Sequence, residues 1–151
     1  MSNTGPSLAW WNAQLPVERR ALAAVEAAVQ QVSDLLPVLK GEHVVADHIR
    51  VACIESFFVN VRLTADFLAL KPDSRDLRAA SLLPGWEYQA AWDQLGSHWN
   101  LASKHVMHMS TLRFPDDLGE IKQITSVQVE EMADDCRDVF ERFKIQYSPA
   151  D

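Results

Sequence analysis

The sequence has little of what several large classes of protein require. It contains only two cysteines, Cys53 and Cys136, and both lie in apolar helical patterns, which favours free thiols in a reducing compartment over a disulfide framework. No window approaches the roughly 18 consecutive apolar residues of a spanning helix, and the N-terminus lacks the basic start and apolar run of a secretory signal. We therefore expect a cytoplasmic protein that does not enter a membrane.

Basic charge is also scarce. The 14 lysines and arginines are outnumbered by 21 aspartates and glutamates, so the formal net charge is −7. This balance argues against broad electrostatic binding to nucleic acid or to an anionic membrane, and nucleic acid is expected only at a local basic pocket. The sequence also contains no glycine-rich phosphate loop, no Gly-x-Ser-x-Gly elbow and no metal-binding cysteine pair. The strongest enzyme signatures are therefore missing.

Helical periodicity dominates what is present. A chain of 151 residues with 48% hydrophobic content is long enough for one domain with a real core, so we assign residues 1–151 to a single domain, with residues 1–6 as a frayed tail. Spacing and capping signals predict an all-α four-helix bundle with a short extra N-terminal helix, and up-down-up-down is its simplest topology. The expected helices are Leu8–Gln14, one entered at Pro16 and ended near Pro37, Glu42–Leu70, Trp86–Leu112, and one after the Thr125/Gln128 capping box. A helical turn is expected within residues 74–80.

The helix expected over Glu42–Leu70 is apolar on most of its circumference. So broad an apolar surface predicts the most buried helix of the bundle. Cys53, Phe57 and Phe67 lie beside an apolar seam that consists of Val45, Ile49, Ala52, Ser56, Val59, Leu63 and Leu70. Its polar residues form a separate stripe: His48, Glu55, Arg62 and Asp66. Arg62 could bridge the two carboxylates in a structural network. Alternatively, its guanidinium could bind a phosphate or carboxylate in a cleft.

The helix expected over Trp86–Leu112 carries three of the five histidines. His98, His105 and His108 fall on one face, beside an apolar stripe that includes Trp99. A metal-binding bundle would need a carboxylate three residues before each liganding histidine, and Ala102 precedes His105 at that spacing, so we assign no metal and no cofactor. The histidines could instead be hydrogen-bonded at a bundle surface.

Lys104 and Arg113 accompany His105 and His108 on this helix. A histidine near cations can act as a general acid or base around a phosphodiester. The same cations near a helix end also interact favourably with its dipole. Both interpretations stay open from the sequence.

Two stretches carry a family resemblance, Glu55–Leu68 (ESFFVNVRLTADFL) and Ser103–Arg113 (SKHVMHMSTLR). They resemble a group of small, uncharacterised bacterial all-helical proteins, in which a Glu/Arg/acidic-Phe-Leu helix accompanies a Lys-His-x-x-His-x-Ser/Thr-x-x-Arg helix. The chain is also similar, more weakly, to the HEPN superfamily of helical bundles, which implies a site of Arg and His. The HEPN signature has Arg before His on one helix, whereas His108 precedes Arg113 here.

Three functions remain as hypotheses. The first is a small-ligand or protein-binding module with a polar Arg/His cleft between two helices. The others are a HEPN-like RNA-cleaving or nucleotide-binding protein and a metal-binding bundle enzyme. We expect a homodimer that associates through an apolar helical face. The candidate catalytic residues are His105 and His108, and the candidate ligand-binding residues are Glu55, Arg62, Asp66, His98, Lys104 and Arg113.

Overall fold

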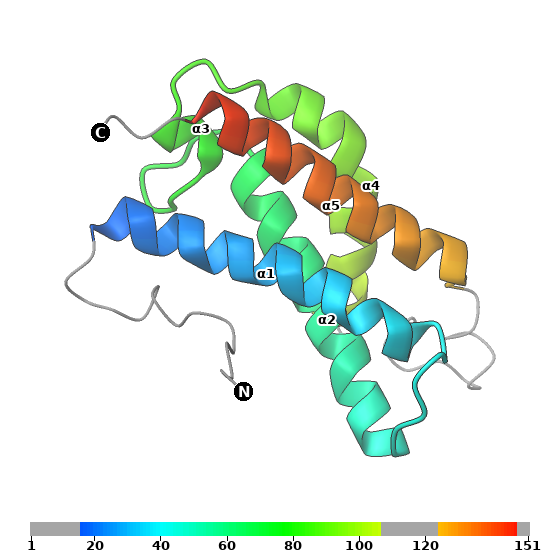
Figure 1. Cartoon of the computed structure of the whole chain (residues 1–151). Helices are drawn as coiled ribbons and strands as arrows, with labels where there is room; N and C mark the ends of the chain where they lie inside the picture. Colours follow the sequence, from blue (N-terminus) through cyan, green and yellow to red (C-terminus); the bar gives the residue numbers. More distant parts are fainter. Residues whose placement is uncertain (1–15, 107–123, 148–151) are drawn as a thin grey trace.

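A computed structural model of the chain describes residues 16–106 and 124–147, apart from the side chains of His105 and Val106. This part is all-α (Figure 1) and confirms the predicted fold class. Four long helices and one short helix make it up: α1 (Val17–Leu39), α2 (Asp47–Ala69), α3 (Ala79–Leu82), α4 (Tyr88–Val106) and α5 (Ser126–Gln146). The helix predicted over Leu8–Gln14 and the last six residues of the one predicted to reach Leu112 lie outside the described residues.

The long helices pair in antiparallel fashion. Lys40 at the end of α1 forms an ion pair with Glu130 near the start of α5, while Lys144 near the end of α5 approaches Glu26 of α1 to 3.9 Å. Trp99 of α4 contacts the second half of α2 through Asp66. Figure 1 shows α1 and α5 crossing in front of α2 and α4.

Several helix boundaries differ from those expected from the sequence: α3 spans Ala79–Leu82 and not residues 74–80, and α4 begins at Tyr88 and not at Trp86. Pro37 lies inside the last turn of α1, and the helix continues to Leu39. The backbone N–H groups of Lys40 and Glu42 then bond to the carbonyls of Leu36 and Pro37, which satisfies two carbonyls of that turn. Gly41, with φ of 77°, reverses the chain in a conformation that glycine adopts without strain. The next helix, α2, begins at Asp47 and not at the predicted Glu42.

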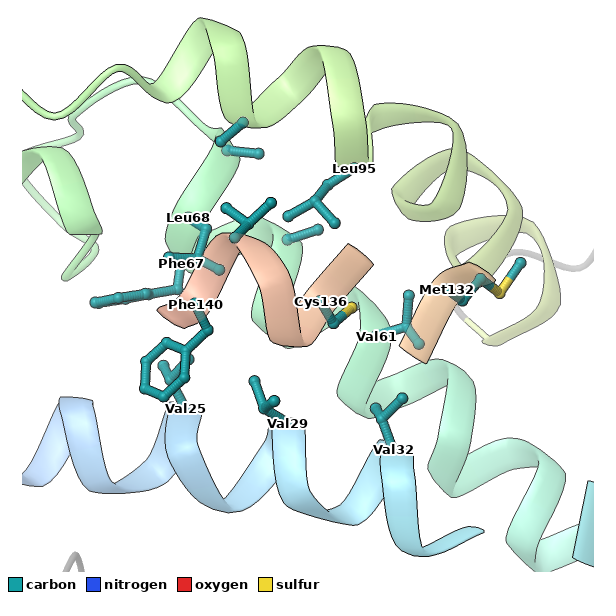
Figure 2. Packing of buried hydrophobic residues seen from close by; sticks show 14 of the residues in the cluster. Val25, Val29, Val32, Val61, Phe67, Leu68, Leu95, Met132, Cys136 and Phe140 are labelled. Carbon is teal, nitrogen blue, oxygen red and sulfur yellow. The ribbon is translucent and has the colours of Figure 1, made fainter. Parts of the chain in front are cut away.

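The core lies where α1, α2, α4 and α5 meet (Figure 2). One face of α1 supplies Val25, Val29 and Val32, which point toward α5 and α2. Trp86, just before α4, donates its indole N–H to the Leu68 carbonyl at 2.7 Å, so this buried polar group is satisfied. This hydrogen bond holds the beginning of α4 against the end of α2.

Much of the apolar seam predicted on α2 is exposed, whereas Phe57 and Phe67 beside it are buried. Ile49, Val59 and Leu63 are 45%, 42% and 39% exposed, and they lie on the outer side of the helix. Because α2 is apolar on nearly every side, its periodicity alone does not say which side is covered. The residues of α2 that are buried are Phe57, Phe58, Val61, Thr64, Ala65, Phe67, Leu68 and Ala69.

The helix α1 has the length and apolar composition that a membrane span would need, with a mean hydropathy of 1.3 over its most apolar window. Core helices of globular proteins and signal sequences near an N-terminus pass the same test, and 22% of this window is buried. The buried residues of α1 are Val25, Ala28, Val29 and Val32.

The start of α5 confirms the predicted capping box. The Thr125 hydroxyl accepts the backbone N–H of Gln128, and the Gln128 side chain accepts the backbone N–H of Thr125. Thr125→Ala should lower the free energy of unfolding by about 1 kcal/mol, because one orphan N–H of the first turn loses its partner. Urea denaturation measures this change. Thr125→Ser keeps the hydroxyl and should retain most of the stability; an equal loss in both variants would contradict the capping role.

Candidate functional site

The candidate site lies at the outer edge of the α2–α4 contact. Asp66 accepts the indole N–H of Trp99 through Oδ1 at 2.6 Å. One turn earlier on α2, the Arg62 guanidinium lies over the Trp99 ring, 5.5 Å from its centroid, which is within the range of a cation–π interaction. Trp99 therefore orients both a cation and an anion.

Arg62 and Asp66 form a loose ion pair. Arg62 Nε lies 3.9 Å from Asp66 Oδ2, which is beyond hydrogen-bond distance. The Nε atom is buried and has no hydrogen-bond partner. The two side chains are 24% and 42% exposed, so solvent reaches both. Within the described residues, Arg62 thus has a fixed orientation but unused hydrogen-bonding capacity.

Glu55 shares the outer face of α2 with this pair. It is exposed and lies two turns before Arg62. Because α4 runs antiparallel to α2, the residues after Trp99 run toward the part of α2 that contains Glu55. Lys104 is exposed in that part of α4. The polar stripe predicted from the sequence therefore borders solvent, and within it Arg62 and Asp66 form the loose ion pair.

His98 points away from Arg62 and toward α5. Its Nε2 lies 2.7 Å from Asp135 Oδ2, and its side chain is only 12% exposed. Gln94, one turn earlier, donates to Asp135 at 2.9 Å and to Asp138 at 3.0 Å. The structure therefore places His98 in a polar network between α4 and α5, and the predicted convergence of His98 with Arg62 is wrong.

The other two predicted histidines, His105 and His108, lie at the limit of the described residues or beyond it. His105 belongs to the last turn of α4, but its side chain is not described, and His108 and Arg113 lie outside the described residues. Whether they meet Arg62 stays a prediction. Among the residues that are described, no group of three or more His, Cys, Asp or Glu side chains could hold a metal ion.

Trp99 is the site residue that sequence reasoning missed. The helical spacing put it in the apolar stripe of its helix, and its ring does pack against the partly buried indole of Trp92 at 5.8 Å. Its N–H, however, needs a hydrogen-bond partner when the ring is half-buried. Asp66, an acidic residue on the polar stripe of the neighbouring helix, was the sequence feature that could have indicated a partner for this N–H.

Comparison of the chain with protein-family models, with curated proteins and with solved structures found no match. The function is therefore argued from the geometry of this site.

Proposed function

We propose that this chain is a small-ligand-binding helical module and that Arg62 binds an anionic group, a carboxylate or a phosphate. One observation carries the proposal: the Arg62 guanidinium is oriented over Trp99, and its buried Nε has no hydrogen-bond partner among the described residues, although a carboxylate lies 3.9 Å away. An arginine that serves only a structural ion pair would be expected to bond directly to that carboxylate.

The chemistry of Arg62 suits this role. A guanidinium offers five N–H donors in a planar fork that matches the oxygens of a carboxylate or phosphate. Stacking on an indole restricts the side chain before binding, so less conformational entropy is lost when the ligand arrives. Asp66 holds the Trp99 indole in place through its other oxygen. In this proposal Asp66 and Trp99 position Arg62, and Arg62 contacts the ligand.

The proposal is tested by titrating the protein with inorganic phosphate and with citrate. The readout is the NMR resonance of the Trp99 indole N–H, which lies beside the site. We expect Arg62→Ala to weaken binding at least tenfold, because a charge-assisted hydrogen bond contributes about 1.5–3 kcal/mol. Arg62→Lys should restore binding only in part, because lysine lacks the planar fork.

Arg50→Ala is the matched control, because Arg50 is an exposed arginine on the same helix. It should bind both anions as the unmodified protein does. If neither anion binds, or if Arg50→Ala loses as much affinity as Arg62→Ala, Arg62 is not an anion-binding residue.

A further inference from the structure

A separate cavity lies on the other side of Asp66, between α1, α2 and the segment that leads into α3. Its volume is about 320 Å³, at the lower end of the range for small-molecule sites. Most of its wall is apolar and comes from Ala21, Ala24, Val25, Leu63, Phe67 and Leu77. The wall therefore suits a compact hydrocarbon or aromatic group.

Three charged residues complete the lining: Asp66, Asp76 and Arg78. Arg78 donates to the Lys71 carbonyl and to Asp76 at 3.1 Å, and its side chain is only 14% exposed. Asp76 is 62% exposed at the rim. The guanidinium that lines the cavity is therefore engaged by the protein itself.

Asp66 supplies a carboxylate to the lining of this cavity. Its Oδ1 accepts the Trp99 indole N–H, whereas Oδ2 is only loosely paired with Arg62, whose Nε lies 3.9 Å away and beyond hydrogen-bond distance. A carboxylate oxygen has two lone pairs that can accept hydrogen bonds. A ligand group that donates N–H bonds and carries positive charge would satisfy this oxygen.

We infer that this cavity binds a small organic amine, with the apolar body against Leu63, Phe67 and Leu77 and the ammonium on Asp66. An anionic ligand is disfavoured because Arg78, the cation in the described lining, is already bonded to the Lys71 carbonyl and to Asp76. The net charge of −7 also attracts cations to the protein from a distance. The inference does not depend on anion binding by Arg62.

Three ligands that share one aromatic body test the inference: phenethylamine, phenethyl alcohol and 3-phenylpropionate. Calorimetry and the methyl resonances of Leu63 and Leu77 report binding. We expect phenethylamine to bind at least tenfold more tightly than the other two. Absence of phenethylamine binding, or equal binding of the alcohol, would overturn the inference.

Two variants test the cavity and the charge separately. Ala24→Met fills the cavity from α1 and should abolish amine binding, whereas Ala27→Met, on the same helix but outside the lining, should leave it unchanged. Asp66→Asn keeps an oxygen that can accept the Trp99 N–H but removes the charge, so amine binding should fall at least tenfold. Circular dichroism confirms that each variant is folded. Unaltered affinity in Ala24→Met or in Asp66→Asn would place the amine elsewhere.

Arg62→Ala distinguishes this inference from the proposed function. It should abolish anion binding but preserve or strengthen amine binding, because it removes a positive charge beside Asp66. If phosphate and citrate fail to bind while phenethylamine binds, the anion proposal fails alone. If Arg62→Ala abolishes amine binding in a folded protein, the assignment of Asp66 as the ammonium partner is wrong.

Discussion

Phe143→Ala should lower the free energy of unfolding by about 3–5 kcal/mol, because it empties the centre of an aromatic cluster. Phe143 is 0% exposed. Its ring contacts those of Phe67 and Trp86 edge-on, each at a centroid distance of 5.4 Å, and stacks on Tyr147 at 5.5 Å. The change removes apolar burial and three ring contacts together.

Urea denaturation followed by circular dichroism measures this loss. Ile145→Ala is the matched control two residues later on α5, because Ile145 is 80% exposed and its truncation should change stability by less than about 0.5 kcal/mol. Similar losses in the two variants would mean that the aromatic cluster contributes little to stability.

The Cys136 thiol should react with thiol reagents at least tenfold more slowly in the folded protein than in the unfolded chain. Burial raises the pKa of Cys136 from 9.0 to about 12, with a smaller contribution from the charge of Asp135. The reactive species is the thiolate, and the raised pKa lowers its population near pH 8, an effect that the greater nucleophilicity of a less acidic thiol offsets only in part. Exclusion of the reagent from the core slows the reaction further.

The cysteine prediction is measured with a chromogenic disulfide reagent on two variants. Cys53→Ser leaves only Cys136 and should react slowly, whereas Cys136→Ser leaves the half-buried Cys53, which should react much faster. Equal rates in the folded variants would contradict the prediction. The raised pKa of Cys136 also makes stability depend on pH. The folded state favours the protonated thiol, and this contribution to the free energy of unfolding is present below pH 9.0 and is lost as the pH rises toward about 12.

Local signals in the sequence were sufficient for α5. The Thr125/Gln128 pair predicts where the helix starts, and the structure confirms it. Val129, Met132 and Cys136 are among the residues buried on one face of this helix. A capping box depends only on residues three apart in the chain. Because the face opposite the apolar stripe is polar, the helix can bury its apolar residues in only one orientation.

The orientation of α2 could not be obtained in this way. Several sides of the helix are apolar, so its rotation is set by packing against the neighbouring helices. This packing buries Phe57 and Phe58 and leaves Val59 and Leu63 exposed. Large aromatic side chains bury more apolar area than valine or leucine and gain more from the interior. The polar stripe therefore came to the outside together with the exposed apolar residues.

By itself the sequence determined the all-α class, the four long helices and the chemical character of the stripe that contains Arg62 and Asp66, because these depend on neighbours within a few turns of one helix. Only the tertiary structure decided that Trp99 joins this pair and that His98 turns to Asp135 instead. Those contacts depend on the rotation of α4 between α2 and α5, and that rotation is set by side-chain packing among residues far apart in the chain.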